Sequence, residues 1–94
     1  MTFTEFQTSM QAQGYTAVVP VEREAGFALP VHSHDFDAEA RIISGDITLG
    51  VVGASAQTYQ VGDIFRLPAG TPHTETVGAS GVTYWAARRE ILAS

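Results

Sequence analysis

The chain contains no cysteine and no lysine among its 94 residues. Without cysteine it can form neither a disulfide nor a zinc site with thiolate ligands. Five arginines stand against ten acidic residues, and the formal net charge is −5. We therefore expect no basic surface for nucleic acid. No apolar run approaches the roughly 20 residues that a membrane-spanning helix needs, so we expect no membrane segment either.

The first ten residues, MTFTEFQTSM, lack the basic start and the apolar stretch of a signal peptide. The cytoplasm is therefore the expected compartment. The apolar fraction of 45% is ordinary for a folded protein, and the length fits one domain over residues 1–94.

One helix is expected over residues 3–13, inside an N-terminal segment that ends at residue 14. Thr2 and Glu5 have the spacing of a capping box, and Gly14 can end the helix. An apolar stripe follows one face of this helix: Phe3, Phe6 and Met10.

From residue 15 the apolar period changes to two, which predicts strands. The expected strands are 15–22, 27–34, 38–43, 47–52, 57–61, 64–67, 71–77 and 82–88. Residues 44–46 are expected to close a hairpin, and residues 78–81 to form a further turn. Short strands between glycine and proline turns at this density predict an all-β sandwich or barrel over residues 15–90.

The three histidines of the chain lie in two segments of this barrel. His32 and His34 are two residues apart, so they share one face of a strand about 6.6 Å from each other. His73 follows the turn Pro68-Ala69-Gly70. Imidazole is the commonest metal ligand, and we expect these three side chains to bind one divalent transition metal: Zn, Fe, Mn, Ni or Cu. The alternative is that they are surface or pocket histidines without a metal.

These two segments resemble the two sequence motifs of the cupins. In the first, five residues separate Gly26 from His32-Ser33-His34, and Gly45 lies eleven residues after His34. The second motif matches at four positions and departs at one, because Val77 stands where asparagine is usual. The four matching positions are Gly62, Pro68, Gly70 and His73.

The resemblance implies a cupin-type jelly-roll barrel, and within it the small stand-alone members, but no particular reaction. A small barrel has exposed strand edges, and pairing two subunits at such an edge covers them. We therefore expect a homodimer.

The fourth metal ligand of the family is a glutamate. Counting back from Gly45 puts this position at Ala38, so Glu39 comes one residue late and would face the outside of the barrel. A bulge before Gly45 would return Glu39 to the interior. Asp37 is a second candidate, and Glu75 or water are further ones.

Glu75 shares a strand face with His73 and is a candidate general base, hydrogen-bond partner or substitute ligand; otherwise it is solvated at the barrel mouth. Phe27, Tyr84 and Trp85 are candidate pocket-lining residues, or simply core. Arg88 and Arg89 end the last strand, where we expect them to be solvated, with anion binding as the alternative.

The sequence therefore predicts a metal-binding cupin acting as a small metalloenzyme, of the dioxygenase, isomerase or hydratase kind. Its substrate would be an organic acid, a phenol or a carbonyl compound. The alternative is a non-catalytic barrel, with or without metal, that binds or senses a small molecule.

Overall fold

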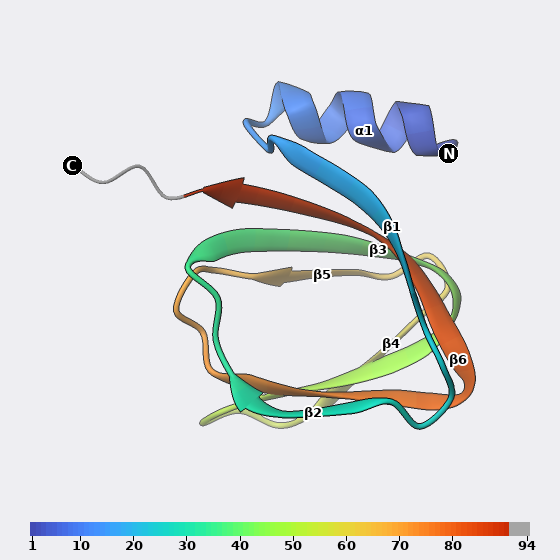
Figure 1. Ribbon diagram of the computed structural model, residues 1–94, viewed down its shortest axis with the longest axis vertical. Helices are drawn as coiled ribbons and strands as arrows, with labels where there is room; N and C mark the ends of the chain where they lie inside the picture. Colours follow the sequence, from blue (N-terminus) through green and yellow to red (C-terminus); the bar gives the residue numbers. More distant parts are fainter. Residues whose placement is uncertain (91–94) are drawn as a thin grey trace.

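One helix and six strands make up residues 1–90, the part of the chain that this computed structural model describes (Figure 1). The elements are α1 (Phe3–Ala12), β1 (Ala17–Arg23), β2 (Ala28–His32), β3 (Phe36–Val51), β4 (Gln57–Gln60), β5 (Ile64–Leu67) and β6 (His73–Glu90). Every strand pair is antiparallel. The prediction of an all-β barrel with one short N-terminal helix is confirmed. The predicted domain end at residue 94 lies outside the described residues.

Helix α1 begins with the predicted capping box. The Thr2 hydroxyl accepts a bond from the backbone N–H of Glu5, whose carboxylate accepts one from the backbone N–H of Thr2. Phe6 and Met10 are buried, and the Phe3 and Phe6 rings pack on Trp85 of β6. The apolar stripe thus fixes α1 on the outer face of the barrel. Within residues 1–90, no helix is long and apolar enough to cross a membrane.

Strands β3 and β6 pair with each other and belong to both layers of the barrel (Figure 1). The first half of β3 and the last part of β6 form one layer with β1 and β5. The second half of β3 and the first part of β6 form the other layer with β2 and β4.

The hairpin expected at residues 44–46 and the turn expected at residues 78–81 are therefore wrong. At both places the chain bends from one layer into the other without reversing, and the register of β3 against β6 shifts there. Gly45 has a φ of +72°, and any Cβ on it would collide with the carbonyl oxygen of Gly81. Gly45 and Gly81 thus permit a tight bulge. In a sequence, a glycine indicates a bulge as readily as it indicates a turn.

The apolar core fills the space between the two layers. It comprises Ala40, Ile42, Ile47, Leu49, Phe65, Leu67, Val77 and Val82. Alternate residues of β3, such as Ala40 and Ile42, face inward, as the sequence pattern predicts. Toward the open end of the barrel the core gives way to a cavity of about 340 Å³. The end of β2 and the start of β6 border this cavity and carry the candidate site.

Candidate metal centre

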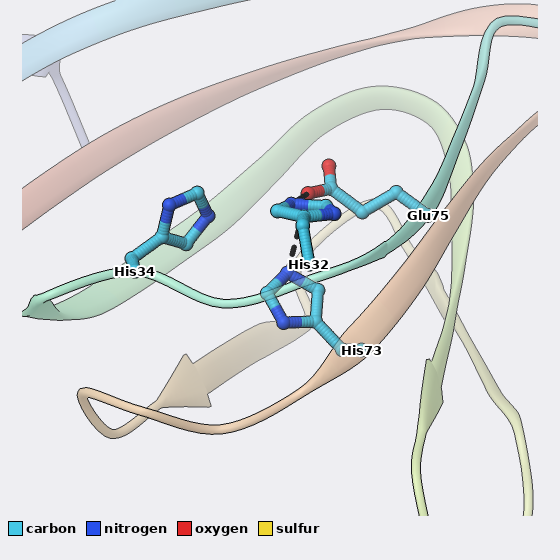
Figure 2. A group of neighbouring side chains, drawn as sticks. All are labelled: His32, His34, His73 and Glu75. Carbon is cyan, nitrogen blue, oxygen red and sulfur yellow. Dashed lines mark hydrogen bonds and ion pairs between the residues drawn. The ribbon is translucent and has the colours of Figure 1, made fainter.

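Three imidazoles and one carboxylate converge at the open end of the barrel (Figure 2). His32 is the last residue of β2, His34 lies in the connection to β3, and His73 and Glu75 lie at the start of β6. Each side chain offers one ligand atom, and these atoms all lie within 4.8 Å of one another. The structure thus brings together the three histidines singled out in the sequence and adds Glu75 to them.

The strand register places three of these side chains. His32 is the cross-strand partner of His73, and Glu75 lies two residues further along β6 on the same face. The turn before β6 is fixed separately, because the backbone N–H of Gly70 donates a 2.7 Å bond to the carbonyl of His34. The His34 segment and the turn that precedes His73 are therefore held together.

The hydrogen bonds of two imidazoles determine which ring nitrogen faces the group. Nδ1 of His32 lies 2.8 Å from the Pro30 carbonyl oxygen, and Nδ1 of His73 lies 2.8 Å from that of Thr71. Since a carbonyl only accepts, both Nδ1 atoms must carry the proton. Each neutral ring then presents an unprotonated Nε2.

Both Nε2 atoms point at the same carboxylate oxygen. Oε2 of Glu75 lies 3.1 Å from Nε2 of His32 and 3.3 Å from Nε2 of His73. With neutral rings, three lone pairs converge, and this arrangement repels unless a cation or protons lie between them. Nitrogen and oxygen donors in this number suit a divalent transition metal, so the residues fit the metal that the resemblance implies.

The group is largely shielded from solvent. His73 is fully buried, and the side chains of His32 and Glu75 are only 26% and 14% exposed. Burial lowers the pKa of His34, and the neighbouring His32 and His73 lower it further. A neutral ring is the form that binds a metal.

The structure does not bring Glu39 or Asp37 into this group. Glu39 lies opposite Arg66 and Ala87 on the outer face of its layer, where its Oε1 accepts a 2.6 Å bond from Nε of Arg66. A register shift does lie before Gly45, between Ile42 and Ser44, but it does not return Glu39 to the interior, because Ala40 and Ile42 are the residues of this segment that face the core. Asp37 accepts a 2.9 Å bond from the backbone N–H of Ala69 and pairs with Arg89. Glu75 is therefore the carboxylate that stands beside the imidazoles.

Of the three aromatic residues expected at the pocket, only Tyr84 lines the cavity. Burial raises the pKa of its hydroxyl, and the nearby Glu75 raises it further. Phe27 packs against the core, and Trp85 lies under α1 because it points to the opposite face of β6 from Tyr84.

From the sequence, Arg88 is expected to be solvated, with anion binding as the alternative; the residue is exposed, and it also borders the cavity, which was not expected. It lies on the inner face of β6, opposite Ala38, and lines the cavity together with Tyr84 and Ala86. Tyr84, Ala86 and Arg88 are spaced two residues apart, so the strand period could have placed Arg88 on the same face as Tyr84.

No family model and no curated protein matches this chain. Solved structures do match. DMSP lyase DddQ from Ruegeria pomeroyi DSS-3 aligns at a TM-score of 0.74 and 22% identity, over 86% of this chain and 41% of that one. This chain thus spans about two fifths of the length of that lyase.

Two further structures carry the same fold. A cupin-2 domain containing protein from Shewanella frigidimarina NCIMB 400 aligns at a TM-score of 0.63 and 18% identity, over 74% of this chain and 66% of that one. Oxalate decarboxylase from Bacillus subtilis aligns at 0.72 and 19%, over 85% of this chain and 22% of that one. In its fold, this chain is a small cupin-type domain.

Proposed function

We propose that this chain binds one divalent transition metal through His32, His34 and His73, with Glu75 as the adjacent carboxylate. The observation that carries the proposal is that Nδ1 of His32 and Nδ1 of His73 each lies 2.8 Å from a backbone carbonyl oxygen, while both Nε2 atoms lie next to Oε2 of Glu75. In the neutral rings the Nε2 lone pairs then face the carboxylate, and a bound cation stabilises this arrangement.

We further propose that the chain is a small metalloenzyme acting on a small organic molecule. A metal bound here would supply a Lewis acid or an oxygen-activating centre. The cavity beside it is lined largely by apolar side chains, which exclude water from the reacting molecule. Glu75 would hold or accept a proton at Oε2, or complete the ligand set.

The reaction classes that we propose are isomerisation, hydration and dioxygenation. The likeness to proteins named DMSP lyase and oxalate decarboxylase adds elimination and decarboxylation to these classes. Another solved structure concerns the Mn(II) centers of oxalate decarboxylase, which makes manganese one metal to test first.

A non-catalytic binding barrel is the second candidate. Val77 is 3% exposed and packs in the core at the position where the second cupin motif carries asparagine, so that polar side chain is lost. We also propose a cytoplasmic homodimer. In residues 1–90, strand β1 pairs only with β6, which leaves its other edge open to a second subunit.

Elemental analysis of the protein, purified without chelator or affinity tag, tests the metal proposal. We expect close to one metal per chain in the native protein and none in the His32→Ala/His73→Ala variant. Glu39→Gln is the control, because that carboxylate lies outside the group. A folded native protein that is metal-free and takes up none of added Mn²⁺, Fe²⁺, Ni²⁺, Cu²⁺ or Zn²⁺ would overturn the proposal.

A further inference from the structure

We propose that Arg88 is a binding residue for a carboxylate group on the molecule that enters the cavity. This deepens the proposed function, because it names the chemical class of the ligand at the same site. The ligand inferred is a small monocarboxylic acid with an apolar body. Its carboxylate lies at Arg88 and its other end reaches the imidazole group.

The position of Arg88 is the first support. Its neighbours along the inner face of β6 are Ala86 and Tyr84, and the residue opposite it in β3 is Ala38. All four line the same cavity of about 340 Å³, which His32, His34 and Glu75 also line. The guanidinium and the candidate metal centre therefore border one space.

The second support is that Arg88 has no anionic partner in the part of the chain that the structure describes. Arg66 is paired with Glu39, and Arg89 with Asp37. Within residues 1–90, Arg88 makes no salt bridge and donates no side-chain hydrogen bond, although its side chain carries five N–H donors. Arg88 is exposed and lines the cavity; Arg23 lines it too and likewise makes no salt bridge among the described residues, but Arg88 lies closer along the chain to the β6 residues Tyr84 and Ala86 that share its face.

The third support is that Arg88 is held in place. Its Cζ lies 4.0 Å from the centroid of the Phe36 ring, in a cation–π contact. The same ring stacks on His34, with centroids 4.8 Å apart and an interplanar angle of 21°. A guanidinium held by its flat face keeps its N–H edges available, and this edge geometry matches a carboxylate.

The size and charge of the cavity select the ligand. Most of the residues that line it are apolar, with Val19, Val21, Leu29, Phe65 and Leu67 among them. The charged residues of the lining are two arginines and two glutamates: Arg23, Arg88, Glu39 and Glu75. A carboxylate brings one negative charge into the space beside Glu75, whereas a phosphate dianion would bring two. A volume of about 340 Å³ is at the lower end for ligand pockets, so the acid must be small.

The test uses butyrate as the probe and butyramide as its uncharged counterpart of equal size. Their affinities are measured by calorimetry or NMR titration on native protein and on Arg88→Gln, each with and without loaded metal. Since a hydrogen bond to a charged group contributes roughly 1.5–3 kcal/mol, Arg88→Gln should bind butyrate about tenfold more weakly or worse. Butyramide binding should not change, and Arg88→Lys should recover part of the butyrate affinity.

Arg41→Gln is the matched control, because it removes the same charge from β3 at a position that does not line the cavity. Butyrate affinity that falls equally in Arg41→Gln and Arg88→Gln, or in neither, overturns the inference. Metal content, measured on the same samples, decides the proposed function separately. If butyrate binding depends on Arg88 in a protein that holds no metal, the inference about Arg88 stands and the proposed metalloenzyme function fails.

Discussion

Oε2 of Glu75 lies 3.1 Å from Nε2 of His32, on the side of the ring away from the carbonyl of Pro30. The cupin motif places its glutamate on the strand that follows the two histidines, but in this chain the carboxylate beside the imidazoles comes from β6. The proposed donor set therefore has the composition that the resemblance implies, three nitrogens and one carboxylate, but its carboxylate comes from a different strand.

This exchange predicts different behaviour for two carboxylates. Glu75→Gln should lower metal affinity about tenfold or more, because the ligand or the partner that orients His32 and His73 is lost. Glu39→Gln should leave metal affinity unchanged, since Glu39 bonds Arg66 on the other face. Competition with a metallochromic chelator measures both. Loss of metal in Glu39→Gln with retention in Glu75→Gln would restore Glu39 as the ligand.

Glu39 should instead contribute to stability. Its side chain is 4% exposed and bonds Nε of Arg66, whose own side chain is 69% exposed. Because solvent screens the arginine, we expect Glu39→Gln to lower the free energy of unfolding by only about 1 kcal/mol. Urea denaturation of the chelated protein measures the change.

The pair can be isolated by a double-mutant cycle. Arg66→Gln should cost a similar amount, and the two changes together should cost less than their sum. Strict additivity would show that Glu39 and Arg66 do not stabilise each other.

The sequence carries much of this structure in local signals. The Thr2 and Glu5 spacing predicts the start of α1, and the two-residue alternation around Ala40 predicts which face of β3 is inside. The same alternation correctly places Glu39 on the outer face. These features depend on residues close together in the chain, which is why sequence reasoning reaches them.

Other features depend on distant pairings and could not be predicted. A glycine such as Gly45 marks a hairpin or a bulge equally well, and only the approach of Gly81 decides between them. Asp37 bonds Ala69 and Arg89, which are 32 and 52 residues away, and these contacts remove it from the ligand candidates. That Arg66 and Arg89 make salt bridges while Arg88 makes none within residues 1–90 likewise becomes visible only in the structure.

The bend in β3 predicts a large cost for a single methyl group. Gly45→Ala would place Cβ against the backbone of Gly81 at a φ of +72°, so both a collision and backbone strain oppose it. We expect a loss of about 3 kcal/mol or more in the free energy of unfolding, measured by denaturation.

Gly53→Ala is the matched control for this effect. Gly53 has a φ of +87°, but a Cβ there would meet nothing within 4 Å. Only the strain of about 1–2 kcal/mol should remain. Equal losses in the two variants would mean that the contact between Gly45 and Gly81 contributes nothing.

Asp37 should make the stability of the barrel depend on pH in the acidic range. The hydrogen bond from the Ala69 N–H, and then that from Arg89, lower the pKa of Asp37 below its usual value of 3.8. A carboxyl group whose pKa is lowered by folding stabilises the folded state above the unfolded pKa, and this contribution disappears as the pH falls through the folded pKa. Stability should therefore fall as the pH drops below about 4.

Asp37→Asn should flatten this dependence. Its free energy of unfolding, measured by urea denaturation of the chelated protein between pH 6 and pH 3, should change less than that of the native chain. Asp35→Asn is the control, because Asp35 is exposed and makes no hydrogen bond or salt bridge within residues 1–90. The same pH slope in Asp37→Asn and the native protein would show that the Ala69 and Arg89 contacts do not depend on the charge of Asp37.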